Sequence, residues 1–289
     1  GFYQLGLDYT LYQSGLFSTY AYPPYFDSKG MPIRAIAISK DEKLIGSRNG
    51  LFYIDERGQR FKSFKVPELR SNMILCIYAY EGKYYIGTYG GGIYVLNPST
   101  LTLSDFETAD LKLTPFLKGH VFSIKSDDKG DLWMATSMGL YCYRNGQQIR
   151  HYTTENSKLP GDNVYDICFD STRKGWICTE NGLCLWDPST NSLKSDVFPE
   201  GFIHKDKIRT VYEDSDHELY FLPDKGAVFI SDLSMNHFRR MQSGTPLDGK
   251  DAMFIVEDHE GWLWIGTNLG LYRYDKKNNF VPYNFVDGL

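Results

Sequence analysis

The sequence predicts an all-β fold of repeated four-stranded antiparallel units, on the evidence of its composition and its periodicity. The 289 residues include 22 Tyr, 18 Phe and 27 Gly, a mixture that suits short strands and tight turns better than helices. A glycine recurs in one short motif at Gly15, Gly50, Gly92, Gly139, Gly182, Gly226 and Gly270, with spacings of 35, 42, 47, 43, 44 and 44 residues by subtraction. A period in the low forties, with strands inside each unit, is the signature of a β-propeller blade.

Each unit opens with an apolar run that we expect to be the innermost strand of a blade. The runs are Arg34–Ile38, Ile74–Tyr78, Val121–Ile124, Val164–Cys168, Ile208–Tyr212 and Met253–Val256. An acidic turn follows, as in Asp258-His259-Glu260-Gly261. In such a turn the Asp side chain caps the backbone, and Gly supplies the positive φ that a hairpin needs.

The second and third strands carry the most regular part of the unit. The second strand reads W-I-G-T or a close variant, and its best copies are Tyr85–Thr88, Trp133–Thr136, Trp176–Thr179 and Trp264–Thr267. The third strand follows as Gly-Leu-aromatic, and a more polar fourth strand completes the unit. Because the middle strands lie between neighbouring blades, both of their faces are buried and the alternation of polar and apolar residues is blurred.

The two ends of the chain bear on the number of blades and on the parent protein. Residues 1–28 read as a contracted copy of the repeat, and counting it predicts a single propeller of seven blades over residues 1–289, with six as the alternative. The six full repeats are expected at about 29–70, 71–116, 117–160, 161–204, 205–248 and 249–289. The last residues, Val286–Leu289, match a segment that leads into a further repeat. We therefore expect the chain to be part of a longer protein.

Charge, hydropathy and cysteine usage argue against several classes of protein. A net charge of −5 disfavours a nucleic-acid-binding surface, which needs a dense patch of Lys and Arg. The sequence has no apolar run of about 18 residues that would predict a membrane span. The five cysteines lie in strand-like runs without a C-x-x-C pair, which favours buried thiols over a disulfide framework.

The complete pattern D-x-x-G-x-L-W-I-G-T-x-x-G-L-Y-R-Y-D, from Asp258 to Asp275, resembles the two-component regulator propeller repeat. Good matches also lie at Asp127–Arg144 and Asp170–Asp187, and four weaker ones extend the resemblance over essentially the whole chain. The resemblance implies the sensory region of a Bacteroides-type hybrid two-component system histidine kinase.

Members of that family carry two tandem propellers, a small β-sandwich, a transmembrane helix and a histidine kinase. The resemblance therefore implies that this chain is a periplasmic sensor domain, the N-terminal of the two propellers, with the second propeller and a homodimer partner beside it. Its ligand would be an oligosaccharide derived from a glycan, and the parent protein would signal through a phosphorelay. The chain would bind no nucleic acid, and it would reach the membrane only through C-terminal parts outside this sequence.

The conspicuous residues of the repeat have a structural explanation. One buried aromatic side chain per blade accounts for Trp133, Trp176, Trp262 and Trp264. The repeated acids read as turn caps rather than catalytic groups; they are Asp41, Asp128, Asp170, Asp214 and Asp258. The run Gly90-Gly91-Gly92 joins two strands, so no helix N-terminus is available to hold a phosphate. The six histidines lack metal-ligand spacing. The sequence thus predicts no catalytic residue, no metal site and no cofactor.

A specific ligand site needs positions that differ from blade to blade, and these lie in the loops around one mouth of the channel. Two sets of loops meet there, those entering the inner strands and those joining the second and third strands. A sugar site combines aromatic faces with side chains that form hydrogen bonds. The candidates are Arg34, Asn72, Tyr89, His120, Asn163, Glu180, Lys207, Asp224 and Asn268.

The hypothesis from the sequence is a non-enzymatic sensor propeller that binds a glycan-derived oligosaccharide and controls a histidine kinase in the parent protein. One alternative is a glycan lyase or hydrolase on the same scaffold, which needs catalytic groups placed across a cleft. A second alternative is a scaffold for protein–protein interaction whose channel mouth docks another domain.

Overall fold

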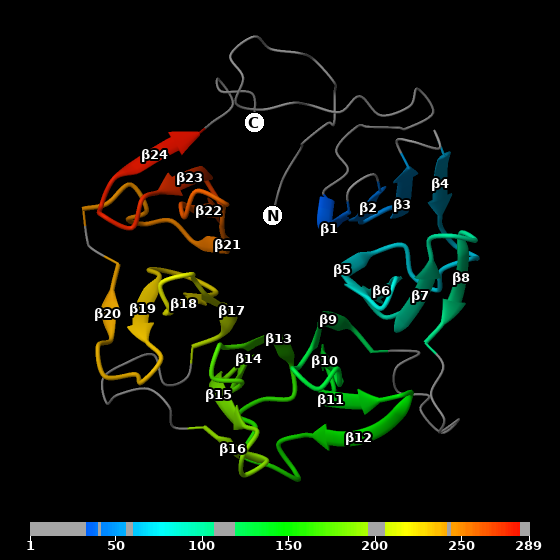
Figure 1. The fold of residues 1–289 in the computed structure, drawn as a ribbon, viewed down its shortest axis with the longest axis horizontal. Helices are drawn as coiled ribbons and strands as arrows, with labels where there is room; N and C mark the ends of the chain where they lie inside the picture. Colours follow the sequence, from blue (N-terminus) through cyan, green and yellow to red (C-terminus); the bar gives the residue numbers. More distant parts are fainter. Residues whose placement is uncertain are drawn as a thin grey trace.

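The computed structural model describes residues 33–39, 42–55, 60–106, 119–195, 206–241 and 244–283. These residues form 24 strands, which pair into six four-stranded antiparallel sheets arranged as blades around a central channel (Figure 1). In each blade the strand nearest the channel comes first in the chain and the outermost strand comes last. The expected β-propeller of four-stranded antiparallel blades is confirmed.

We number the blades in chain order. Blade one contains β1 (Ile33–Ile38), β2 (Glu42–Ser47), β3 (Gly50–Asp55) and β4 (Arg60–Phe64). Blade two contains β5 (Ile74–Tyr80), β6 (Lys83–Thr88), β7 (Ile93–Asn97) and β8 (Thr102–Asp105). Blade three contains β9 (Val121–Ser126), β10 (Leu132–Thr136), β11 (Gly139–Arg144) and β12 (Gln147–Tyr152). Blade four contains β13 (Val164–Phe169), β14 (Gly175–Thr179), β15 (Gly182–Asp187) and β16 (Ser192–Lys194). Blade five contains β17 (Ile208–Glu213), β18 (Glu218–Pro223), β19 (Phe229–Asp232) and β20 (Arg239–Arg240). Blade six contains β21 (Ala252–Glu257), β22 (Leu263–Thr267), β23 (Gly270–Tyr274) and β24 (Phe280–Tyr283).

The expectation of seven blades is wrong, and the alternative of six is the number that the described residues form. The contracted copy placed at residues 1–28 lies outside the described part of the chain. The seventh blade was counted from that contracted copy alone, whereas each of the six full repeats supplies four paired strands.

Large aromatic side chains fill the space between neighbouring blades. The ring centroids of Trp133 in β10 and Trp186 in β15 lie 4.7 Å apart, in a cluster with Ile167 and Ile177. Trp133 and Trp176 are 0% and 1% exposed, and burial of one such ring removes roughly 150–250 Å² from water. The structural role expected for these two tryptophans is therefore confirmed. Trp262 and Trp264 are only half-buried.

In blades three to six, one aspartate holds the turn that follows the inner strand. Asp170 Oδ1 accepts hydrogen bonds from the backbone N of Thr172 and Lys174 at 2.8 and 3.1 Å, and Oδ2 accepts one from Trp176 Nε1 at 2.9 Å. The side chain thus fixes the turn and the indole of the next strand together. The same arrangement recurs at Asp127 and Asp258. Asp214 caps its turn in the same way, but there the donor from the next strand is the hydroxyl of Tyr220.

The capping role predicted for Asp170, Asp214 and Asp258 is confirmed, whereas the prediction for Asp128 is wrong. In blade three Asp127 caps the turn, because only this residue lies six positions before the indole that it must bind. Asp128 is exposed and pairs with Arg173 at 3.3 Å. Asp41 lies outside the described residues.

The turn between the second and third strands requires both the Thr and the Gly of the motif. Thr136 Oγ1 donates to the carbonyl O of Gly139 at 2.7 Å and accepts from the backbone N of Met138 at 3.0 Å. Gly139 has a φ of +98°, and a Cβ there would lie 2.2 Å from the carbonyl O of Tyr152. Only glycine combines this backbone conformation with such a close approach.

The cysteines are free, and Cys142, Cys178 and Cys184 are buried. Burial raises the pKa of the Cys142 and Cys184 thiols to about 12. The part of the chain that the structure describes contains no helix with the length and apolar character of a membrane span.

Candidate ligand site at the mouth of the channel

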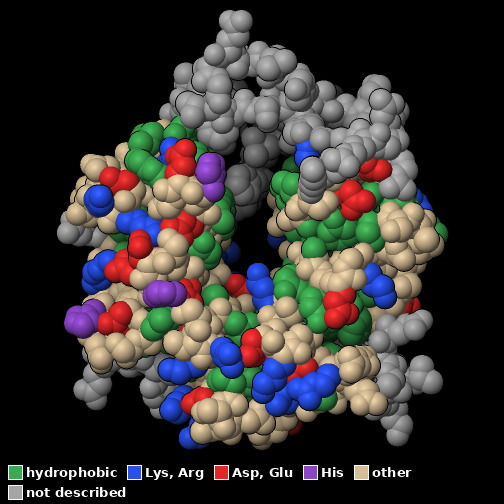
Figure 2. Space-filling view, in the orientation of Figure 1, with side chains coloured by type: hydrophobic (Ala, Val, Ile, Leu, Met, Phe, Trp, Pro, Cys, Tyr) green, Lys and Arg blue, Asp and Glu red, His purple; other side chains and the backbone are tan. Residues whose placement is uncertain are grey.

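The two ends of the channel are built from different turns. The turns that join second to third strands, and the segments that enter the inner strands, lie at one end, which we call the mouth. The turns that join first to second and third to fourth strands lie at the other end, which we call the opposite face. Figure 2 shows the hollow at the centre of the ring.

A repeated backbone hydrogen bond brings the two sets of mouth loops together. The residue that follows a second strand donates its N–H to the carbonyl O of the residue that precedes the inner strand of the same blade. The pairs are Tyr89 with Met73, Ser137 with His120, Glu180 with Asn163, Asp224 with Lys207 and Asn268 with Asp251, at 2.8 to 3.2 Å. The fold therefore places in contact several of the residues that the sequence analysis selected.

Each inner strand contains a β-bulge at its second residue. In blade one Ile33 pairs with Ser47 and Ala35 with Gly46, which leaves Arg34 without a partner in the ladder. The equivalent register shift occurs in all six described blades. A bulge leaves one residue unpaired and redirects its side chain. We call the six bulged residues the bulge ring: Arg34, Leu75, Phe122, Tyr165, Arg209 and Met253.

The bulge ring lines a single cavity of about 300 Å³ in the channel, together with Lys207 and Thr210. This volume is at the lower end of the range for small-molecule sites. The ring supplies two guanidinium groups, two aromatic rings and two aliphatic or thioether side chains, one from each blade. The six copies of one backbone position thus carry five kinds of side chain around one space.

An arc of rings runs from the mouth into this cavity. The centroids of Tyr89 and His120 are 3.7 Å apart in a stacked pair, those of His120 and Phe122 are 6.0 Å apart, and those of Phe122 and Tyr165 are 5.1 Å apart. Lys207 Nζ lies 4.3 Å from the centroid of the Tyr165 ring, within the range of a cation–π interaction. Aromatic faces and a cation are therefore adjacent on the cavity wall.

The charged groups at the mouth are incompletely paired. Asp224 Oδ1 lies 2.7 Å from Arg209 Nη2 and 3.3 Å from Lys207 Nζ. Both contacts of this oxygen are ion pairs whose geometry does not make a hydrogen bond. The buried Nε of Arg209 also has no hydrogen-bond partner among the described residues. The buried Nδ1 of His120 has none either, and burial lowers the pKa of this imidazole. His120 is thus biased toward its neutral form.

The nine predicted residues fall into two groups. Arg34 and Lys207 line the cavity, and Tyr89, His120 and Asp224 contact its lining residues directly or through the aromatic arc.

The other four form hydrogen bonds within the mouth loops. Asn72 Oδ1 accepts from Val66 N at 2.8 Å, Asn163 Nδ2 donates to Glu180 Oε2 at 2.5 Å, and Asn268 Oδ1 accepts from Asp251 N at 3.1 Å.

The sequence analysis missed most of the bulge ring. The sequence predicts only ordinary inner-strand residues at the five other positions of the ring, which are Leu75, Phe122, Tyr165, Arg209 and Met253. A usable signal was present, because the first residue of each inner strand is Ile, Val or Ala, whereas the second differs in nearly every blade. Variation at one position of a regular repeat indicates a residue that the scaffold does not require.

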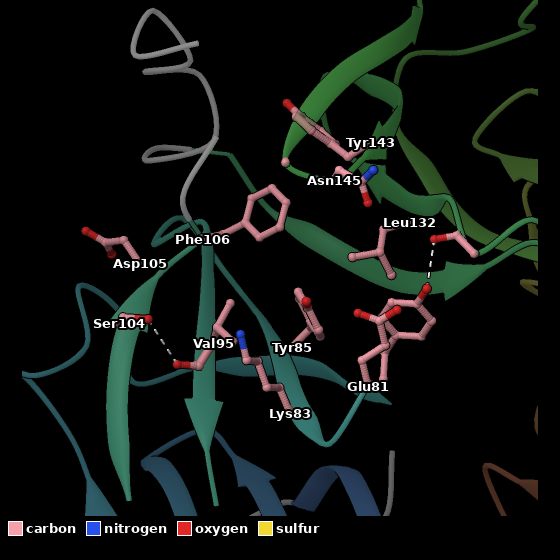
Figure 3. Close-up of a pocket in the computed structure, with 13 residues that line it drawn as sticks. Glu81, Lys83, Tyr85, Val95, Ser104, Asp105, Phe106, Leu132, Tyr143 and Asn145 are labelled. Carbon is pink, nitrogen blue, oxygen red and sulfur yellow. Dashed lines mark hydrogen bonds between the residues drawn. The ribbon is translucent and has the colours of Figure 1, made fainter. Parts of the chain in front are cut away.

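A second cavity, of about 290 Å³, lies between blades two and three (Figure 3). Tyr85, Phe106 and Tyr143 line it, and Phe106 packs edge-on against both tyrosines at 6.1 and 5.3 Å. Tyr80 donates its hydroxyl to the carbonyl O of Gly130 at 3.0 Å. These contacts join the two blades, so packing accounts for the aromatic residues. The described residues contain no group of three or more His, Cys, Asp or Glu able to hold a metal ion.

Comparisons with known proteins agree with this architecture. No family model matches the chain, and no curated protein matches it in sequence. Among solved structures, the extracellular domain assigned to the hybrid two-component system BT3049 from B. thetaiotaomicron has a TM-score of 0.72 and 23% identity over 90% of this chain. The chain spans 35% of the length of that domain.

Two further structures share the architecture. A catalytically inactive variant of virginiamycin B lyase from Staphylococcus aureus, solved with quinupristin, has a TM-score of 0.68 and 14% identity, covering 89% of this chain and 86% of the lyase. PorZ, a surface component of the type-IX secretion system of Porphyromonas gingivalis, has a TM-score of 0.66 and 16% identity, covering 94% of this chain and 44% of PorZ. At these identities the likeness shows a common propeller fold.

Proposed function

We propose that this chain is the ligand-binding propeller of an extracytoplasmic sensor and that it binds a glycan-derived oligosaccharide at the mouth of its channel. The bulge ring carries the proposal: six side chains of five kinds, one from each blade, converge on one cavity. The likeness to an extracellular domain of a hybrid two-component system supports the same role, as does the repeat pattern complete from Asp258 to Asp275.

The cavity wall suits a sugar. The rings of Phe122 and Tyr165 lie 5.1 Å apart by their centroids and offer apolar faces to the C–H groups of a pyranose, while Arg34 offers hydrogen-bond donors to its hydroxyls. Removal of one aromatic platform should therefore weaken binding without unfolding the blade.

Signalling would occur in a longer receptor. In this proposal the chain lies in the periplasm, next to a second propeller and a homodimer partner, and ligand binding changes the activity of an attached histidine kinase. The ligand acts only if its affinity differs between two arrangements of the receptor.

Calorimetric titration of the 289-residue chain with a panel of oligosaccharides tests the proposal. Tyr165→Ala should weaken binding about fivefold or more, since stacking on one aromatic ring contributes on the order of 1 kcal/mol. Tyr80→Ala, in the aromatic cavity between blades two and three, is the matched control and should bind like the unmodified chain.

The proposal fails if no member of the panel binds, or if Tyr80→Ala weakens binding as much as Tyr165→Ala. Product formation in the same mixtures would identify an enzyme instead. Retention of a protein partner without any sugar binding would identify an interaction scaffold.

A further inference from the structure

The cavity inside the bulge ring has a charge opposite in sign to that of the whole chain. Among the residues that the structure describes, three cations line it, Arg34, Lys207 and Arg209, and no described lining residue is a carboxylate. Asp224 contacts two of these cations, and Asp166 accepts a hydrogen bond from the lining residue Thr210 at 2.6 Å. Counting both acids leaves 3 − 2 = +1 at the cavity, whereas the chain carries −5.

We infer that the ligand carries an oxyanion substituent, a carboxylate or a sulfate ester, which is bound by Arg209 with the help of Arg34 and Lys207. This inference rests on the proposed function, because it names the class of oligosaccharide that the cavity selects.

Arg209 is the most informative of the three cations. One nitrogen, Nη2, is directed at Asp224 at 2.7 Å, while Nε is buried without a hydrogen-bond partner in the described part of the chain. A buried donor without a partner is costly and uncommon in a folded protein. The guanidinium group binds carboxylate and sulfate oxygens through two parallel N–H donors, so an oxyanion would give Nε the partner that the protein does not provide.

Asp224 holds the cations in place without neutralising them. It forms ion pairs with both Lys207 and Arg209, so one negative charge is shared between two positive ones. Its side chain is 29% exposed, so solvent partly screens its charge and the two cations keep part of their attraction for an anion. An oligosaccharide would also gain contact with the aromatic rings.

The aromatic and cationic elements are adjacent, as an acidic sugar requires. Lys207 Nζ lies 4.3 Å from the centroid of Tyr165, and Tyr165 and Arg209 come from the inner strands of neighbouring blades. The face of a pyranose on Tyr165 would therefore leave its carboxylate or sulfate within the reach of both basic side chains.

The test uses the 289-residue chain and two matched pairs of oligosaccharides. Tetragalacturonate and its methyl ester differ in the carboxylate charge; a sulfated carrageenan tetrasaccharide and its desulfated form differ in the sulfate ester. We expect the acidic member of at least one pair to bind about tenfold or more tightly than its neutral counterpart, with affinity that falls as salt is added. The pair that shows the difference identifies the oxyanion.

Variants assign the effect to the cavity. Arg209→Gln and Arg34→Gln should each reduce the acidic preference several-fold, and Arg34→Lys should restore most of it. Arg34 is exposed, so its variants keep the test valid if Arg209→Gln folds poorly. Arg173→Gln, on the opposite face, is the charge-matched control and should keep the preference.

Equal binding of the neutral and acidic members of both pairs overturns the inference and leaves the proposed function intact. An acidic preference that Arg34→Gln and Arg209→Gln do not change also overturns it. If neither these four oligosaccharides nor the wider panel bind, the proposed function fails, and the inference fails with it.

Discussion

On the opposite face of the ring, acidic side chains are held by several hydrogen bonds each, whereas at the mouth some buried polar atoms have none. Glu257 Oε2 and Oε1 accept from Ser215 N and Oγ at 2.7 and 2.6 Å, which joins blade six to blade five. At the mouth, by contrast, the Nε of Arg209 and the Nδ1 of His120 have no hydrogen-bond partner among the described residues. The acids named on the opposite face thus join blades, whereas two buried nitrogens at the mouth have no partner among the described residues.

The contacts between blades on the opposite face also form a series. Glu213 Oε2 accepts from Ser171 N at 2.6 Å, and this repeats the contact of Glu257 with Ser215 one blade earlier. Lys276 then joins Asp214, Asp216 and Glu257 at 3.0, 2.7 and 2.7 Å. Acids on this face are therefore structural, although a cluster of carboxylates in a propeller would otherwise suggest catalysis.

The largest expected effect comes from Gly139→Ala. It tests whether a repeated residue at the mouth is needed for stability, as the repeated acids on the opposite face are. A Cβ would lie 2.2 Å from the Tyr152 carbonyl O at a φ of +98°, so we expect a loss of about 4 kcal/mol in the free energy of unfolding. Urea denaturation followed by tryptophan fluorescence measures it. The control is Gly226→Ala, where φ is +90° but no atom lies within 4 Å of the Cβ, and a loss of about 1 kcal/mol is expected. Equal losses would show that the close approach contributes nothing.

Lys276→Met should be the next most destabilising change, because it leaves carboxylates without their cation. The side chain of Asp214 is 0% exposed and that of Lys276 is 14% exposed, so removal of the lysine should cost about 3 kcal/mol. The same denaturation experiment applies. Lys277→Met alters the neighbouring, exposed lysine and should change stability by less than about 0.5 kcal/mol. A small effect of Lys276→Met would mean that the interblade ion pairs are dispensable.

Trp176→Phe should show how much the bond between the turn aspartate and the indole contributes. The substitution keeps an aromatic ring but removes the Nε1 donor that lies 2.9 Å from Asp170 Oδ2. We expect a loss of about 2 kcal/mol in the free energy of unfolding, from the unpaired buried oxygen and the smaller ring. Trp176→Phe combined with Asp170→Asn would recover part of this loss if the bond is the cause. No recovery would attribute the whole loss to packing.

Acid should weaken the opposite face first. Burial alone would raise the pKa of Asp258, but hydrogen bonds from Trp264, the backbone N of Trp262 and Glu260, and Arg273 lower it from 3.8 to about 2. A carboxyl with a depressed pKa contributes stability that is complete above its unfolded value and is lost as the pH falls through the folded value. We therefore expect the contribution of Asp258, on the order of 1 kcal/mol after solvent screening, to disappear between about pH 4 and pH 2. The urea midpoint of Asp258→Asn should change less between these pH values than that of the unmodified chain. If the midpoints of both proteins fall in parallel with pH, Asp258 is not the group responsible.

Arg34→Gln should have the smallest effect on stability, because this residue lies outside the strand ladder and is exposed. We expect its unfolding midpoint in urea to match that of the unmodified chain to within about 0.5 kcal/mol. A large loss would mean that the bulge ring supports the fold, and would remove the distinction between the two faces.

The fold could be predicted from the sequence because each repeated residue obeys a local rule. Asp170 caps a turn, Thr179 closes the next turn on Gly182 at 2.9 Å, and Trp176 fills an interblade space; all three are recognisable from spacing alone. The number of blades was harder to predict, because the seventh depended on a contracted copy that lacks the D-x-x-G turn and the W-I-G-T strand of the best repeats.

The cavity could be predicted only in part. Arg34 and Lys207 were selected because they enter inner strands, but Tyr165 and Arg209 were not, since a polar or aromatic residue within an apolar run is indistinguishable from an interblade contact. A bulge depends on the register between two strands, and register is a property of the pairing rather than of either strand by itself.

The bulges also have a consequence for how such a site can change over evolutionary time. Each bulged residue contributes its side chain to the channel while its neighbours in the strand maintain the ladder. Specificity can therefore be altered one blade at a time, by single substitutions that leave the packing between blades untouched. Under the proposed function, a duplicated copy of this chain would need only a few changes at these six positions to recognise a different chemical group.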